Sequence, residues 1–168
     1  MDSTLHVSGG GLTMSMTPVI VEPIQYVIHP DCPNEVPVAS PAMEGDVGFD
    51  LRVWIPKGSL VIWPFSFANI PTGVFVKLPT ETWGDIRPRS STFAKRRLFV
   101  MGGTIDSGYT GQLSIFIFNP SWRPHKVYNG DRLAQLVVGM RVAPSLVKVL
   151  KLPETARSQA GFGSSGTN

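Results

Sequence analysis

The stretch GQLSIFIFN, residues 111–119, decides the fold class of this chain. Its side chains alternate, with Leu113, Ile115 and Ile117 on one face and Phe116 and Phe118 on the other. A period of two is that of a β-strand, and apolar side chains on both faces are typical of a strand covered on both sides. The stretch therefore predicts a strand in the interior of a β protein.

Further short β-rich runs follow one another along the chain, separated by turn signals such as Asn129-Gly130-Asp131. The other expected strand regions are residues 20–21, 26–28, 49–55, 59–62, 65–70, 72–77, 83–88, 98–101, 125–127, 132–140 and 146–150. No stretch has a convincing amphipathic period, and one short helical turn is expected within residues 91–97. The pattern predicts an all-β architecture, a barrel or a jelly-roll-like sandwich.

The chain has 168 residues, of which 42% are hydrophobic, which suits one domain with a core. We expect a flexible leader over residues 1–18, a β-rich core over 19–156 and a C-terminal arm over 157–168. Cys32 is the single cysteine, so an intramolecular disulfide is excluded. No signal peptide or run of 18 apolar residues is evident, so we expect a cytoplasmic or nuclear protein, or one of the host cell if viral, that neither enters membranes nor is secreted.

The net charge of +3 and the pI of about 9.2 make the chain mildly basic. Such a balance is compatible with a polyphosphate ligand. No dense Lys/Arg stripe is present, so direct binding of nucleic acid is not expected.

The segment GGTIDSGYTG, residues 102–111, has four glycines, which allow a tight hairpin and close approach of the main chain to a ligand. Asp106 could orient or deprotonate a water, and Tyr109 offers a flat, rigid face. The unpaired main-chain groups of a hairpin can read the edge of a base. The alternative is an ordinary hairpin with a solvated aspartate.

Three other segments carry polar groups suited to a nucleotide. In PRSST, residues 88–92, Arg89 is followed by two serines, and phosphate oxygens accept from such donors. In GDRLAQLV, residues 130–137, Gln135 stands among apolar residues, so it is either at an exposed edge or hydrogen-bonded to a specific group. In VGFDL, residues 47–51, Asp50 either bonds a neighbouring loop or faces a metal through water.

The last twelve residues, RSQAGFGSSGTN, combine one cation, Arg157, and one aromatic ring, Phe162, with small residues. Such a segment cannot build a core, but it could fold over a ligand that carries phosphate and a flat ring. Glycine- and serine-rich tails can also be artificial linkers, which Arg157 and Phe162 argue against. The segment is not a P-loop, because no Gly-Lys-Ser/Thr follows.

In order and spacing, these five segments resemble the five motifs of the trimeric dUTP pyrophosphatase (dUTPase) family, over residues 20–168. The resemblance implies a distorted jelly-roll or β-barrel-like fold, a homotrimer with sites at the subunit junctions, and a mobile C-terminal arm. It also implies Mg²⁺-dependent hydrolysis of dUTP to dUMP and pyrophosphate, which limits uracil in DNA and supplies dUMP for thymidylate synthesis.

The resemblance implies a role for each motif residue. Asp106 would activate the attacking water, Tyr109 would pack against the deoxyribose, and the hairpin main chain at Gly103 and Ile105 would read uracil. Asp50 would reach Mg²⁺ through water, and Arg89 would help to position the site. The remaining contacts to phosphates, water or base would come from Ser90, Ser91, Gln135, Arg157, Phe162, Gly163, Ser164 and Ser165.

One departure concerns Ser91, which stands where the family usually has glycine. The related dCTP deaminases often have a serine there, but they carry a glutamate ten residues after the third-motif aspartate. This chain has Phe116 at that place, and Ala94 where those enzymes have arginine. A further alternative is a partner-binding regulator with the dUTPase fold, whose docking surface would include residues 91–97.

Overall fold

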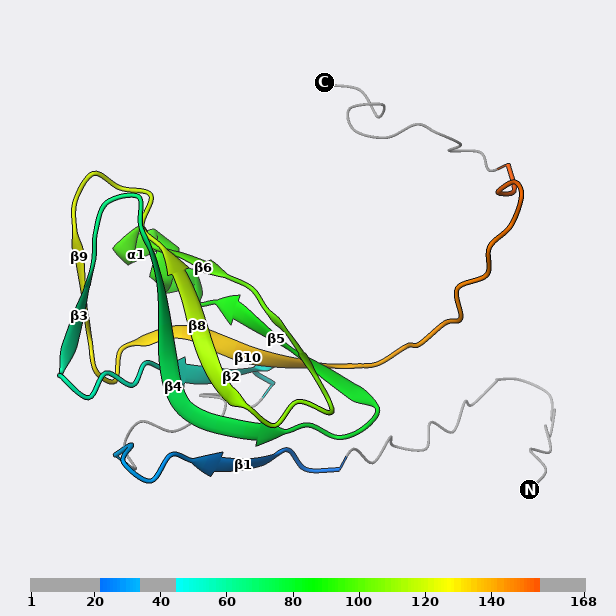
Figure 1. The fold of residues 1–168 in the computed structure, drawn as a ribbon, viewed down its shortest axis with the longest axis horizontal. Coiled ribbons are helices and arrows are strands. Elements are labelled where there is room, and N and C mark those ends of the chain that lie inside the picture. Colours follow the sequence, from blue (N-terminus) through cyan, green and yellow to red (C-terminus); the bar gives the residue numbers. More distant parts are fainter. Residues whose placement is uncertain (1–21, 34–44, 155–168) are drawn as a thin grey trace, which may run out of the picture.

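The computed structural model describes residues 22–33 and 45–154, and the description below concerns these residues. They form β-strands and one short helix (Figure 1). The elements are β1 Gln25–Ile28, β2 Gly48–Arg52, β3 Ser59–Ile62, β4 Phe67–Lys77, β5 Thr82–Pro88, α1 Ser90–Arg96, β6 Phe99–Met101, β7 Thr104–Asp106, β8 Gln112–Phe118, β9 His125–Tyr128 and β10 Arg132–Met140.

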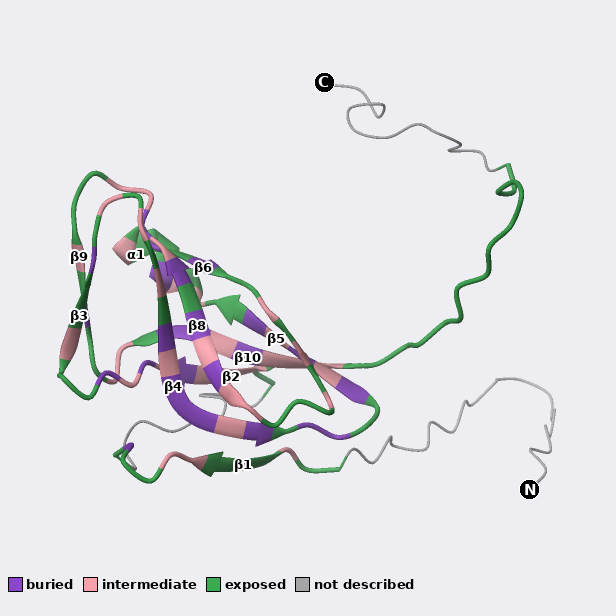
Figure 2. Ribbon diagram, viewed as in Figure 1, coloured by how far each residue is buried: buried purple, intermediate pink, exposed green. Residues whose placement is uncertain are grey.

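The strands form two four-stranded sheets, of order β1-β4-β8-β6 and β2-β10-β5-β7, and a two-stranded sheet of β3 and β9. Neighbouring strands run antiparallel throughout. Buried side chains from both larger sheets form one hydrophobic core, to which β2 and β10 contribute Leu51, Leu133 and Leu136 (Figure 2). The prediction of an all-β fold is confirmed.

Strand β8 lies inside its sheet, between β4 and β6, as the alternating stretch predicted. Leu113, Ile115 and Ile117 are at most 1% exposed. The expectation that both faces of this strand are buried was wrong for this single chain, because Phe116 on the outer face is 52% exposed. Phe118 on the same face stacks on Phe67 of β4, with ring centroids 4.7 Å apart. The outer face is thus apolar without being covered.

Strand β4 joins two predicted strands, residues 65–70 and 72–77, into one. Its pairing with β8 shifts between Pro71 and Phe75, where Gly73 has a φ of +73°. The buried Thr72 hydroxyl donates to the Leu113 carbonyl oxygen at 2.8 Å and accepts from the Val74 N–H, so the irregular backbone keeps its hydrogen bonds. A bend of this kind lets one long strand wrap around the core.

The strand predicted at residues 146–150 is absent. The prediction was therefore wrong for the chain taken on its own. After β10 the described chain continues to residue 154 without strand pairing and runs away from the sheets (Figure 1). The side chains of Leu146 and Leu150 are fully exposed. A strand needs a hydrogen-bonding neighbour, and the described residues give this segment none. The strand expected at residues 20–21 lies outside the described residues.

The predicted helical turn within residues 91–97 is confirmed as α1. It ends at Arg97, whose φ of 55° is left-handed, and whose guanidinium lies 5.8 Å from the centre of the Phe93 ring. Across the described parts of the chain, no helix has the length and apolar character needed to cross a membrane.

Candidate functional site

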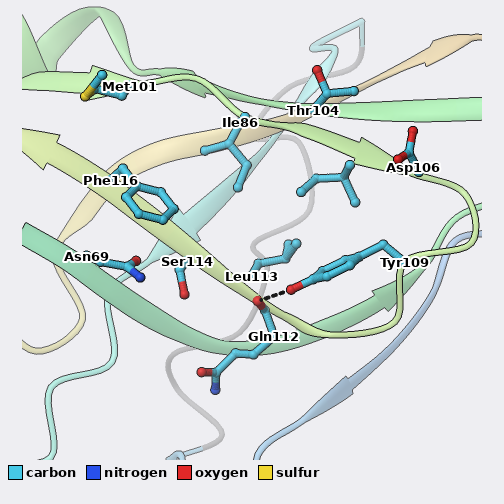
Figure 3. A pocket seen from close by; sticks show the side chains of 12 residues that line it. Asn69, Ile86, Met101, Thr104, Asp106, Tyr109, Gln112, Leu113, Ser114 and Phe116 are labelled. Carbon is cyan, nitrogen blue, oxygen red and sulfur yellow. Dashed lines mark hydrogen bonds between the residues drawn. The ribbon is translucent and has the colours of Figure 1, made fainter.

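A first cleft, of about 370 Å³, lies between the glycine-rich hairpin and strand β8 (Figure 3). We call it the hairpin cleft. Asp106 and Tyr109 lie toward one end of it, and Met101 and Asn69 toward the other. Its lining contains four of the predicted site residues, Gly103, Ile105, Asp106 and Tyr109.

The hairpin holds Asp106 and Tyr109 at a fixed spacing. Strand β7 pairs with β5 so that Asp106 lies opposite Trp83, and the Tyr109 N–H donates to the Asp106 carbonyl oxygen at 2.9 Å. The Tyr109 hydroxyl then donates to the Gln112 carbonyl oxygen at 2.9 Å, which folds its ring back over Gly111. The carboxylate of Asp106 is exposed at this end of the cleft, where a ligand or water can reach it.

A second cleft, of about 260 Å³, lies at the other end of β5, and we call it the arginine cleft. Its lining gathers four predicted site residues from three motifs, together with the loop before β2: Asp46, Val47, Gly48, Asp50, Arg89, Ser90 and Gln135. Sheet register explains the gathering, because Gln135 of β10 pairs with Asp50 of β2, and Ala134 pairs with Pro88 at the end of β5.

Ion pairs organise the arginine cleft. The Asp50 carboxylate accepts from Arg89 Nε at 2.7 Å and from Arg132 Nη1 at 3.1 Å, and its side chain is 16% exposed. Of the two possibilities for Asp50, bonding to a neighbouring segment is therefore present. Gln135 lies on an interior strand and donates from Nε2 to the Pro88 carbonyl oxygen at 3.2 Å, so it is hydrogen-bonded rather than at a sheet edge. Sequence reasoning missed Arg132, although it is part of the quoted fourth motif.

Helix α1 fixes the serines that follow Arg89. The buried Thr92 hydroxyl donates to the Leu133 carbonyl oxygen at 2.8 Å, and Arg96 donates to both carboxylate oxygens of Asp131, at 2.6 and 2.8 Å. Burial raises the pKa of Asp131, but the hydrogen bonds from Arg96 and the Tyr128 N–H, with the Arg96 charge, bring the net pKa below its ordinary value. Sequence reasoning did not find this link.

Ser91 is half-buried in α1 and is not part of the lining of either cleft. Among the described residues, the non-glycine positions with positive φ are Phe65 and Arg97, so Ser91 occupies a backbone conformation open to any residue. The usual glycine is therefore not needed at this position for its φ angle.

The predicted site residues of the C-terminal arm lie outside the described residues. They are Arg157, Phe162, Gly163, Ser164 and Ser165.

Acidic, histidine and cysteine side chains are scattered over the described residues rather than gathered as metal ligands. Within residues 22–33 and 45–154, no group of three or more His, Cys, Asp or Glu side chains is placed to hold a metal ion. Asp50 is paired with two guanidinium groups, but a carboxylate oxygen accepts more than one hydrogen bond. Asp50 therefore fits a contact through water better than direct coordination.

Asp106 and Arg89, one from each cleft, are far apart within one chain. Asp106 lies opposite Trp83 near the start of β5, and Arg89 directly follows the end of the same strand, six residues after Trp83. At about 3.3 Å per strand residue, the separation is about 20 Å. The structure thus brings the third-motif residues together, and the residues of the first, second and fourth motifs together, but does not bring the two groups to one place.

Residues 34–166 match the sequence profile of the dUTPase family. The chain belongs to the dUTPase family. A deoxyuridine 5'-triphosphate nucleotidohydrolase of Paramecium bursaria Chlorella virus 1 is 36% identical over 123 residues, which are 73% of this chain and 85% of that protein. The enzyme of the same name from Avian adenovirus 8 is 39% identical over 125 residues, 74% of this chain and 75% of that protein.

Solved structures of this family have the same fold. The dUTPase of Staphylococcus bacteriophage 80alpha, with dUpNHpp, superposes with a TM-score of 0.74 at 25% identity and covers 86% of this chain and 99% of its own. The dUTPase from phage phi11 of S. aureus, described with a structural Mg(II) ion, has a TM-score of 0.69 at 23% identity and covers 79% and 100%. Because the phi11 protein is only 23% identical, its similarity to this chain concerns the fold alone.

Proposed function

We propose that this chain hydrolyses dUTP to dUMP and pyrophosphate, with Asp106 as the general base. The observation that carries the assignment is the exposed Asp106 carboxylate at one end of the hairpin cleft, three residues from a tyrosine ring that lines the same cleft. The relatives named above are deoxyuridine 5'-triphosphate nucleotidohydrolases, which favours this nucleotide over others. The reaction lowers the dUTP available to DNA synthesis and supplies dUMP.

In the proposed reaction, water attacks phosphorus and Asp106 accepts its proton. The bond that breaks joins dUMP to the departing pyrophosphate, so one water yields both products. Tyr109 packs its ring against the deoxyribose and leaves no room for a 2′-hydroxyl. Main-chain groups at Gly103 and Ile105 bind the edge of uracil. Such chemistry depends on alignment and on charge stabilisation more than on covalent participation by the protein.

The arginine cleft supplies the phosphate contacts in this proposal. Arg89 uses Nε for Asp50, and a guanidinium has five N–H donors, so others can bind phosphate. Ser90 and Gln135, which line this cleft, add neutral donors that need no proton exchange. Asp50 holds the Arg89 and Arg132 guanidinium groups in place and so defines the shape of the cleft.

The two clefts complete each other when they come from different copies of the chain, and we propose a homotrimer. A base that activates water must lie within hydrogen-bond reach of it, and about 20 Å separates Asp106 from Arg89 in one chain. The fully exposed Leu146 and Leu150 support the same assembly, because apolar side chains on an unpaired segment favour burial against another chain. The trimer itself is what family membership implies.

Magnesium has an indirect place in the proposal. Mg²⁺ keeps several of its waters and is usually held by substrate phosphates with one or two carboxylates, which agrees with the absence of a metal-binding cluster among the described residues. Asp50 would contact the hydrated ion through water. When bound, the ion would neutralise charge on the triphosphate.

The C-terminal arm completes the proposed site. Arg157 would bind the γ-phosphate and Phe162 would lie over uracil, while Gly163, Ser164 and Ser165 would follow the phosphates. A closing arm excludes bulk water from the reaction.

The test is pyrophosphate release from dUTP, dTTP, dCTP and UTP, measured side by side with Mg²⁺. We expect strong preference for dUTP, and we expect Asp106→Asn to lower kcat by about 10²–10⁴-fold while a non-hydrolysable dUTP analogue still binds. Near-normal turnover by Asp106→Asn would contradict the base assignment. Ammonia release from dCTP without pyrophosphate would instead indicate a deaminase.

A further inference from the structure

A lysine outside all five motifs contacts the turn that carries the proposed catalytic groups. Lys77 is the last residue of β4, and its ammonium Nζ donates a hydrogen bond to the Ser107 carbonyl oxygen at 2.8 Å. Ser107 is the residue directly after Asp106 and lies within the turn that leads to Tyr109. One side chain from a distant part of the sequence therefore holds the segment that spaces Asp106 and Tyr109.

One side of the turn has no packing against the rest of the chain, although Tyr109 hydrogen-bonds within the hairpin. A Cβ added at Gly108 would meet no atom within 4 Å, so this side of the turn faces open space. Its entrance is fixed where Asp106 pairs with Trp83 of β5. Beyond its exit, Gln112 of β8 pairs with Phe75 of β4. Strand β4 therefore contacts the chain just after the turn through Phe75. Lys77, two residues further along β4, contacts the middle of the turn at Ser107.

We propose that Lys77 is a positioning residue for the reaction, which fixes the spacing of Asp106 and Tyr109 by binding the Ser107 carbonyl. The inference rests on the function proposed above. A hydrogen bond from a charged donor is stronger than a neutral one, and small misplacements of catalytic groups lower rates steeply. Because one group activates water and the other excludes the 2′-hydroxyl, Lys77 affects both the rate and the choice of sugar.

The experiment compares three variants of the full-length protein in assays with dUTP and UTP. Lys77→Met keeps the aliphatic stem and removes the donor, and Lys77→Arg keeps a charged donor. Lys57→Met removes an exposed lysine from a turn that lines neither cleft, and so controls for the loss of surface charge.

We expect Lys77→Met to lower kcat for dUTP about threefold to tenfold, as for the loss of one hydrogen bond, and to lower the ratio of kcat/KM for dUTP over UTP. Lys77→Arg and Lys57→Met should remain close to the unsubstituted protein in both measures. The midpoint temperature of thermal unfolding should be nearly unchanged in all three variants, because Lys57 and Lys77 are both exposed.

Two outcomes would overturn the proposal. In one, Lys77→Met leaves kcat and the nucleotide ratio unchanged. In the other, KM alone rises equally for both nucleotides, which is the result expected for a surface charge that attracts polyphosphates. Both are distinguishable from failure of the proposed function, because in either case the unsubstituted protein would still hydrolyse dUTP and Asp106→Asn would still lower kcat by about 10²–10⁴-fold.

Discussion

Gly111 gives the ring of Tyr109 the space to fold back against the start of β8. A methyl group at this position would lie 2.6 Å from Tyr109 Cζ and closer still to the hydroxyl, so the ring would have to leave and its bond to the Gln112 carbonyl would break. We expect Gly111→Ala to lower kcat/KM for dUTP by about tenfold or more and to weaken discrimination against UTP.

The matched control is Gly108→Ala in the same turn. Its Cβ would occupy open space, and Gly108 does not have a positive φ, so turnover should remain near normal. Steady-state kinetics with both nucleotides measure the difference. Equal losses in the two variants would mean that the turn tolerates no side chain at all, and that Tyr109 is not the cause.

Residue identities pointed to side chains that the structure groups into two clefts, while the roles of these residues stay predictions. Asp106 and Tyr109 share a cleft, and Asp50, Arg89, Ser90 and Gln135 share another. Arg132 and Lys77 were missed because their roles depend on which strands become neighbours. A lysine at the end of β4 gives no local signal that its ammonium will meet a carbonyl thirty residues later.

At the scale of elements, α1 is held against the β9–β10 turn by the Arg96–Asp131 pair. The folded-state pKa of Asp131 is below its ordinary value of 3.8, so the pair's contribution to stability is fully present well above pH 3.8. It is lost as the pH falls through the lower folded-state pKa. We expect Asp131→Asn to lower the free energy of unfolding at neutral pH by about 1 kcal/mol. The effect is small because the Arg96 side chain is partly exposed, so solvent screens the ion pair.

The measurement is urea unfolding of both proteins at about pH 7 and about pH 3, at one protein concentration so that assembly contributes equally. The difference between the two proteins should shrink at the acid pH, which lies below the ordinary pKa of 3.8 and so within the range where the contribution of the charge is being lost. A difference that stays constant with pH would show that Asp131 stabilises through its shape and not its charge.

Element prediction succeeded where periodicity and burial agree. Strand β10 was predicted with its observed bounds, residues 132–140, and β8 by the alternation of its apolar residues. The three-residue strand β7 was missed because it is too short to show a period. Residues 146–150 have strand-like composition but no partner in their own chain, and composition does not reveal whether a partner exists.

At the scale of the whole molecule, the separation of about 20 Å between Asp106 and Arg89 predicts that two inactive variants can restore each other. Asp106→Asn keeps an intact arginine cleft, and Arg89→Ala keeps an intact hairpin cleft. If the clefts meet across a subunit junction, refolding the two variants together in equal amounts should leave about one site in four with both halves intact.

Pyrophosphate release by the co-refolded mixture, compared with each variant refolded alone, provides the measurement. A mixture of Asp106→Asn with Asp106→Ala is the control, since no combination of those chains restores the base. No recovery in the first mixture, with mixed oligomers demonstrated by a tag on one variant, would place both halves of the site in one chain.

The exposed segment after β10 also bears on the order of events during synthesis. The ribosome releases the strands of both sheets before it releases residues 141–154, so the body can fold while this segment is still being made. Each newly made chain then exposes Leu146 and Leu150 to other proteins of the cell. A second copy of the chain and a chaperone would then compete for these side chains, and the one that arrives first binds them. Translation of several copies from one messenger RNA would favour the second copy.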